Sequence, residues 1–212
     1  MLLFDMDGTL IDSNGIWKDV DTEFLARRGL PYTQAYYEGV AHTIFPLAAK
    51  FTKEFCHLPE SEEEIMAEWM ELAGDLYAGS VPEKPGVRAF LERMRARGER
   101  MAVVTSAVPV HCRSALTHLG LLSYFERIFF AQELGMEKKT PELWKKVAAE
   151  LNAAPEACTL FDDSVEAIRG AKAAGMHTVG VADPYFASCA GEMAQTCEKF
   201  VSGFDAPEMA AF

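Results

Sequence analysis

The sequence predicts an α/β fold, in which one helical insertion interrupts a mostly parallel sheet with helices on its faces. Three observations indicate this architecture. Short apolar runs alternate with helical patterns over most of the chain, whereas one long stretch after the first run contains helical patterns alone. The chain also has 212 residues, 50% of them hydrophobic, which is enough for one large domain with a modest insertion.

Five runs are expected to be buried strands, because they are short and apolar on both faces. They cover residues 1–4, 101–104, 128–131, 158–161 and 178–181. The helices expected around them cover residues 86–98, 109–120, 140–152 and 164–174. Strands that alternate with helices at this spacing imply right-handed crossovers and a mostly parallel sheet.

The ends of these helices carry residues typical of helix termini. Gly86 opens the first helix and Gly98 closes it, while Gly175 ends the fourth. Thr140 and Pro141 open the third helix, as an N-cap and a proline in the first turn.

Residues 14–82 break the alternation and are expected to form a separate helical domain, with 1–13 and 83–212 forming the α/β core. Ser61, with Glu64 three residues later, predicts a capping box at the start of one helix. That helix has one apolar face, made of Ile65, Trp69, Leu72 and Leu76. Because the insertion follows the first strand, we expect it beside the carboxyl end of that strand, where it can act as a lid for a ligand.

Composition argues against several classes of protein. The net charge of −12, with no cluster of Lys and Arg, argues against a nucleic-acid groove or contact with an anionic membrane. No apolar run approaches the roughly 20 residues of a membrane span, and the opening MLLF is too short for a secretory signal. Five cysteines without a CxxC pair predict free thiols in a reducing cytoplasm. We therefore expect a cytoplasmic protein and, as for many acidic chains of this size, a monomer.

The first strand runs directly into two acids, Asp5 and Asp7, followed by Gly8. In an open α/β sheet, ligands bind outside the carboxyl ends of the strands, so both carboxylates are expected at that edge. Two acids at the end of a buried strand repel each other and resist desolvation unless a cation lies between them. Gly8 permits the turn that follows. The pattern also occurs in Asp-rich turns and calcium loops, but the rest of a calcium loop is missing here.

Four segments in order resemble the four motifs of the haloacid dehalogenase superfamily of phosphohydrolases. They are FDMDGTL at 4–10, MAVVTS at 101–106, KKTPELW at 138–144 and LFDDS at 160–164. The helical insertion after the first segment is similar to that of the subfamily containing phosphoglycolate phosphatases and β-phosphoglucomutase. The resemblance implies a Rossmann-like parallel sheet with an α-helical cap domain, and a phosphatase acting on a small phosphorylated metabolite of the sugar phosphate, phosphoglycolate or nucleotide type.

The resemblance also implies roles for individual residues. Asp5 would attack phosphorus and form an aspartyl phosphate, and Asp7 would act as general acid and then general base. Lys138 would bridge Asp5 and the phosphate, stabilising the transition state. Thr105, through its hydroxyl, and Ser106, through its backbone amide, would bind phosphate oxygens.

A magnesium ion is implied as the cofactor. Its ligands would be the Asp5 carboxylate, the Asp7 backbone carbonyl, and the acids Asp162 and Asp163. Of these two acids, Asp163 is the better supported metal ligand, because relatives often carry Glu or Gly where Asp162 stands. Ser164 is expected to cap the next helix.

The lysine of the third motif has two candidates. The proline that usually follows this lysine is replaced by Lys139, so the alignment depends on Pro141 and Trp144 and favours Lys138. The five histidines show no spacing typical of a catalytic triad or a metal site, so we expect packed or solvated roles for them.

Four other functions compete with a phosphatase. A dehalogenase does not need Asp7, and a phosphonate-cleaving relative usually carries a small residue there. A non-catalytic binding module would be expected to lack an acid or the lysine, and none is missing.

A mutase resembling β-phosphoglucomutase keeps every core residue, so the insertion must distinguish it. Its cap histidine aligns with Trp17, and its phosphate-binding arginine aligns with His42, within a loop at 38–45 that is expected to face the site. Both differences favour hydrolysis, because neither residue replaces its counterpart well.

Overall fold

A computed structural model describes residues 1–40 and 45–212 and confirms the predicted fold class. Six parallel strands form one sheet in the order β3-β2-β1-β4-β5-β6. They are β1 (Leu2–Phe4), β2 (Met101–Thr105), β3 (Arg127–Phe130), β4 (Thr159–Asp162), β5 (His177–Val181) and β6 (Lys199–Val201). The strand order reverses at β1, because the chain adds β2 and β3 on one side and β4 to β6 on the other. Ligands bind beside such a reversal, at the carboxyl ends of the strands.

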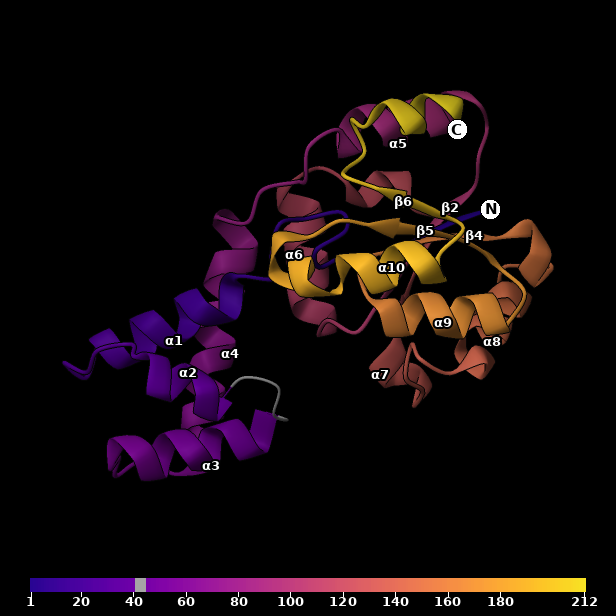
Figure 1. The fold of residues 1–212 in the computed structure, drawn as a ribbon. Helices are drawn as coiled ribbons and strands as arrows, with labels where there is room; N and C mark the ends of the chain where they lie inside the picture. Colours follow the sequence, from indigo (N-terminus) through magenta and orange to yellow (C-terminus); the bar gives the residue numbers. More distant parts are fainter. Residues whose placement is uncertain (41–44) are drawn as a thin grey trace. The chain divides into compact units, whose positions relative to one another are not determined.

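Helices cover both faces of this sheet (Figure 1). Helix α5 (Val87–Ala96) lies on one face, and α8 (Pro141–Glu150), α9 (Val165–Ala173) and α10 (Ala190–Thr196) lie on the other. The other helical elements of this unit are α6 (Pro109–His118), α7 (Ala131–Leu134), η1 (Leu122–Tyr124), η2 (Pro155–Ala157), η3 (Pro184–Cys189) and η4 (Pro207–Ala211).

The two faces of the sheet have different cores. One contains aliphatic strand residues packed against α8 and α9, with Trp144 as its largest buried side chain. The other is aromatic and is formed by Phe4, Phe90, Phe161 and Phe204. Phe4 of β1 stacks on Phe161 of β4 with ring centroids 4.9 Å apart. Burial of these large side chains holds β1 and β4 together, and both strands end at acidic residues.

The predicted strands and helices of this sheet are all present, with ends that differ by a few residues. Strand β6 and helix α10 were not predicted. Thr140 does stand at the N-cap position of α8, but its hydroxyl donates to the Glu137 carbonyl and does not cap the helix.

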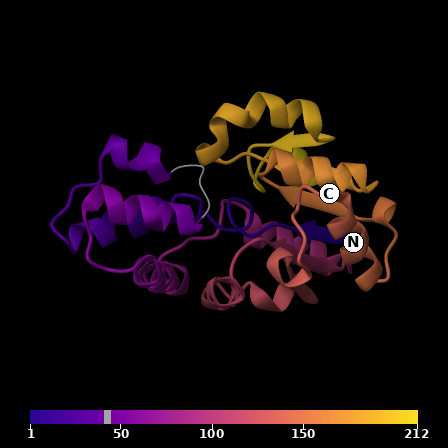
Figure 2. The same cartoon turned by 90° about the horizontal axis from the view of Figure 1, so that it is seen from below.

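Contacts divide the chain into two compact units, one formed by Met1–Asn14 with Val81–Phe212 and the other by Gly15–Ser80. The second unit is helical and contains α1 (Ile16–Ala26), α2 (Gln34–Val40), α3 (Phe45–Cys56) and α4 (Glu62–Gly79). Within this unit α4 packs against α1 and α3, and α2 packs against α3 (Figure 2).

Helix α4 begins as predicted. Ser61 and Glu64 form a capping box in which each side chain accepts a hydrogen bond from the other residue's backbone N–H. Ile65, Trp69 and Leu72 on the predicted apolar face are buried, and Leu76 is partly exposed.

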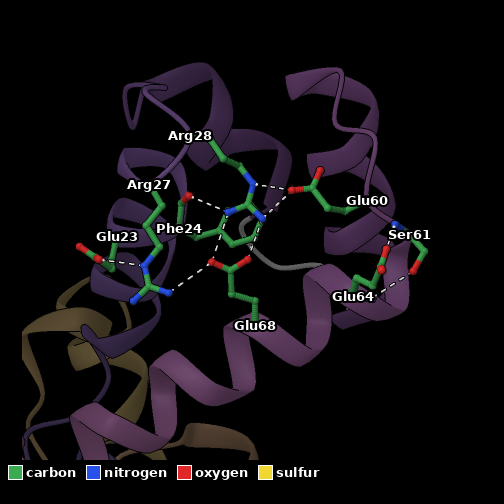
Figure 3. A network of polar contacts seen from close by, with 8 residues as sticks. All are labelled: Glu23, Phe24, Arg27, Arg28, Glu60, Ser61, Glu64 and Glu68. Carbon is green, nitrogen blue, oxygen red and sulfur yellow. Dashed lines mark hydrogen bonds and ion pairs between the residues drawn. The ribbon is translucent and has the colours of Figure 1, made fainter.

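Arg28 joins the helices of the second unit through a polar network (Figure 3). Its guanidinium lies over the ring of Phe24 at 3.7 Å from the centroid and donates to Glu60 at 2.8 Å and Glu68 at 2.6 Å. A planar guanidinium suits such shared carboxylate contacts, which tie the end of α1 to α4 and to the loop before it.

Across the described residues, no helix has both the length and the apolar character required to span a bilayer. All five cysteines are free thiols, as the sequence predicts.

Candidate active site

Three carboxylates converge where β1 and β4 end. Phe4 of β1 is paired with Phe161 of β4, and the Asp5 backbone N–H donates to the Phe161 carbonyl at 2.9 Å. Asp5 therefore lies level with Asp162, and Asp163 follows. One oxygen atom from each of these three acids lies within 4.8 Å of the others. The pairing register of two neighbouring strands thus brings together residues from the first and fourth motifs.

The cluster is buried and strongly acidic. Asp162 is fully buried, and Asp5 and Asp163 are each 5% exposed. Burial raises the pKa of Asp163 above its ordinary value, and the charges of Asp5 and Asp162 raise it further. Burial also raises the pKa of Asp162, although Lys138 partly opposes this. Three buried carboxylates this close together form a donor set that suits a hard divalent cation, because such a cation prefers oxygen ligands and offsets their repulsion.

Lys138 is the cationic member of the site. Its Nζ lies 2.6 Å from Oδ1 of Asp5 and 2.7 Å from Oδ2 of Asp162. Burial alone lowers the pKa of Lys138, but the charges of Asp162 and Asp5 outweigh burial and raise it, so the ammonium stays charged. The loop carrying Lys138 is fixed at its backbone, because the Trp144 indole N–H donates to the Lys138 carbonyl at 2.7 Å.

Lys139, the alternative lysine, has a different environment. Its side chain is exposed and pairs with Glu137. The structure therefore brings Lys138, and not Lys139, to the acid cluster, as the alignment through Pro141 and Trp144 favours.

Asp7 lies in the turn that follows β1. This turn is closed by a hydrogen bond from the Gly8 N–H to the Ile11 carbonyl, and Gly8 has the positive φ of 76° that favours glycine. The Asp7 carboxylate lies outside the three-acid cluster and accepts a 2.5 Å hydrogen bond from the Ser13 hydroxyl. This bond fixes the orientation of the carboxylate.

Two side-chain contacts in this turn were not predicted. Ser13 orients Asp7, and Asn14 donates to Asp163 at 2.7 Å. The sequence places both residues just after the first motif, but no local pattern indicates which carboxylate each one meets.

The second motif ends at β2, beside β1 in the sheet. Thr105 is fully buried, and its hydroxyl oxygen accepts a hydrogen bond from the Ala107 N–H at 2.9 Å. The hydroxyl proton can still be donated to a ligand. Ser106 directly follows the carboxyl end of β2, so its backbone amide lies at the same edge of the sheet.

Ser164 has the capping role that the sequence predicts. Its side chain accepts from the Ala167 N–H at the start of α9, and its own N–H donates to Asp162 at 2.9 Å. His111 is packed, with 5% of its surface exposed. His42 and half of the loop at 38–45 lie outside the described residues, so the predicted position of this loop stays a prediction.

A cavity of about 330 Å³ adjoins the cluster on the side of β5 and β6. Asp163 and Asp183 contribute to its wall, which is otherwise mainly apolar. Asp183 forms a buried ion pair with Lys84, with 2.5 Å between Nζ and Oδ2. The ammonium group of Lys84 balances the charge of Asp183. Asp163 belongs both to the cavity wall and to the acid cluster, so it connects the two.

Residues 2–181 match the family model described as haloacid dehalogenase-like hydrolase. The chain belongs to this family. Its membership accounts for the acids at the ends of β1 and β4 and for the lysine between them, and it makes the chain an enzyme of the hydrolase class.

Two curated relatives and one solved structure illustrate what this hydrolase is similar to. It is 26% identical to a phosphorylated carbohydrates phosphatase of Thermotoga maritima, over 84% of this chain and 82% of that one. It is 27% identical to hexitol phosphatase B of Escherichia coli, over 86% and 83%. The structure of a predicted phosphoglycolate phosphatase from Haemophilus somnus superposes with a TM-score of 0.83, at 20% identity and over 100% and 97% of the two chains.

Proposed function

We propose that this hydrolase is a magnesium-dependent phosphatase that releases inorganic phosphate from a small phosphorylated metabolite through an aspartyl phosphate on Asp5. The observation that carries the proposal is the position of Lys138, whose Nζ is within 2.7 Å of both Asp5 and Asp162. A buried lysine between a candidate nucleophile and a candidate metal ligand lies where a transferring phosphoryl group would need positive charge.

The first step forms the intermediate. A carboxylate oxygen of Asp5 attacks phosphorus as the bond from phosphorus to the leaving oxygen breaks. Asp7 protonates that leaving oxygen, so the organic part departs as a neutral alcohol. The hydrogen bond from Ser13 supports this role, because it holds the Asp7 carboxylate in one orientation.

The second step hydrolyses the intermediate. Asp7, now ionised, removes a proton from water, and the resulting oxygen attacks phosphorus and breaks the bond to Asp5. Free Asp5 and inorganic phosphate result. Lys138, the Thr105 hydroxyl and the Ser106 amide would stabilise the charge on the phosphoryl oxygens in both steps.

Asp5, Asp162 and Asp163, with the Asp7 backbone carbonyl, would hold magnesium. The ion would supply positive charge that lets carboxylate and phosphate approach each other. The donor set supports this assignment, because the three buried acids lie within 4.8 Å of one another.

The names of the relatives narrow the range of candidate substrates. Two of them are phosphatases of phosphorylated carbohydrates and hexitols, which favours a sugar or polyol phosphate. We also propose that the helical unit, Gly15–Ser80, is a cap that selects the organic part of the substrate, because it is inserted directly after the strand that carries Asp5.

The test is a screen of the purified protein with magnesium against many phosphorylated metabolites, with released phosphate as the readout and ranking by kcat/KM. At least one sugar or polyol phosphate should be hydrolysed well above the rate of the Asp5→Asn protein. Equal phosphate release by both proteins on every ester would contradict the proposal.

A further inference from the structure

Asn14 contacts one of the three clustered acids from a distant part of the chain. Its side-chain Nδ2 donates to Oδ2 of Asp163 at 2.7 Å, across a separation of 149 residues. The Thr9 hydroxyl lies 3.5 Å from the other oxygen of the same carboxylate. The segment after β1 therefore supplies both Asp5 itself and a strong hydrogen bond to its partner in the cluster.

Gly8 leaves the space in which Asn14 and Asp163 meet. A Cβ atom on residue 8 would lie 2.1 Å from Nδ2 of Asn14 and 2.1 Å from Oδ2 of Asp163. Any side chain there would displace one partner. Gly8 is thus required for two independent reasons, its positive φ of 76° and the contact between these two side chains.

The chemistry of the donor matters in this position. Asp163 faces two other carboxylates in a buried site, so a neighbour that adds no further negative charge suits this position. The Asn14 amide N–H donates to the carboxylate without adding charge, and it fixes the direction of the oxygen atoms. A ligating carboxylate must be correctly oriented, and partners of this kind commonly change metal affinity by about 10- to 100-fold.

We propose that Asn14 is a positioning residue that orients Asp163 for a divalent cation. The inference rests on the metal site of the proposed function. Asn14 itself provides no ligand atom in this account, so it should affect how tightly the cation binds and have little effect on turnover once the cation is bound.

The experiment measures magnesium binding to the full chain by isothermal titration calorimetry, with no substrate present. The variants are Asn14→Ala and, as a matched control, Gly15→Ala. Gly15 is the next residue of the same connection, has an ordinary φ of −79° and has no atom within 4 Å of the position that a Cβ would take. The control therefore perturbs the same segment without touching Asp163.

Asn14→Ala should raise the magnesium dissociation constant about tenfold, whereas Gly15→Ala should stay within about twofold of wild type. Thermal denaturation should show that the metal-free Asn14→Ala protein is still folded. In phosphatase assays, its kcat at saturating magnesium should return to within about threefold of wild type, because excess cation overcomes weaker binding.

A dissociation constant in Asn14→Ala within about twofold of wild type would overturn the inference. Should the Ala variant fail to fold, Asn14→Leu, which keeps the bulk and removes the donor, is judged by the same criterion. If wild type itself binds no magnesium, the proposed metal site fails. If wild type and Asn14→Ala bind it equally, only the role of Asn14 fails.

Discussion

The ammonium group of Lys138 lies 2.6 Å from a carboxylate oxygen of Asp5, although 133 residues separate them in the chain. Asp5 is buried and the Lys138 side chain is only 11% exposed, so little solvent screens this contact, and the same ammonium also meets Asp162. The contact joins the first, third and fourth motifs in one site.

Replacing this lysine should abolish most activity. Lys138→Ala should lower kcat by about 10²- to 10³-fold, the usual cost of losing one group that stabilises transition-state charge. Lys139→Ala is the matched control, because Lys139 is exposed and pairs with Glu137. It should stay within about twofold of wild type. Steady-state phosphate release checks both variants, and a larger loss in Lys139→Ala would contradict the assignment.

Chelation should remove activity. EDTA treatment should abolish turnover and added magnesium should restore it, whereas calcium should restore it poorly because its larger, more variable shell misplaces Asp5. Full turnover by metal-free enzyme would refute the metal site.

Replacing each of the two acids of the fourth motif should have a different effect. Asp163→Ala should raise the magnesium concentration for half-maximal activity more than Asp162→Ala. Asp162→Ala should instead lower the melting temperature, since Asp162 also accepts the Ser164 N–H and pairs with Lys138. Magnesium titrations and thermal denaturation of both variants check this ranking, and the reverse order would contradict it.

Much of this site could be predicted from the sequence because its chemistry is local. Asp5, Asp7, Asp162 and Asp163 lie in short motifs at strand ends, and alternating strands and helices fix which edge of the sheet they share.

Other features depend on where distant segments meet. The sequence favours Lys138 over Lys139 only through the alignment at Pro141 and Trp144, and the contacts of Lys138 with Asp5 and Asp162 decide between the two. The turn around Gly8 sets the contacts of Ser13 and Asn14, and no hydrophobic pattern in the sequence predicts these contacts. Strand β6, Lys199–Val201, contains only two consecutive apolar residues, too few for a clear strand pattern.

Asp21 should make the stability of the helical unit depend on pH. Burial raises the pKa of Asp21 from 3.8 to about 6, although the Tyr36 hydroxyl partly opposes the rise by donating to it at 3.0 Å. A raised pKa means that the folded state holds the proton more tightly than the unfolded state. The stabilisation that the Asp21 carboxyl contributes to the folded state is therefore complete below pH 3.8, and it is lost as the pH rises through about 6.

Asp21→Asn should remove this dependence, because the amide stays neutral and still accepts from Tyr36. Its free energy of unfolding should equal that of wild type near pH 4 and exceed it by about 2–3 kcal/mol at pH 7. Urea denaturation at several pH values measures this difference. A difference between wild type and Asp21→Asn that does not change with pH would contradict the prediction.

The enzyme should hydrolyse and not isomerise sugar phosphates. The sequence alignment predicts Trp17 at the position of the mutase cap histidine, and this exposed residue of α1 has no imidazole with which to hold back Asp7. Incubation with β-glucose 1-phosphate and a trace of the 1,6-bisphosphate should release phosphate without rapid formation of glucose 6-phosphate. Rapid isomerisation with little free phosphate would instead identify a mutase.

The central claim is that Asp5 is the nucleophile, and turnover by Asp5→Asn tests it most directly. The amide has nearly the same shape and cannot attack phosphorus usefully, so phosphate release from the best substrate, at saturating magnesium, should fall by at least about a thousandfold in a folded protein. Mass spectrometry must show that the variant has not deamidated back to Asp. Activity within tenfold of wild type in such a preparation would contradict the covalent mechanism.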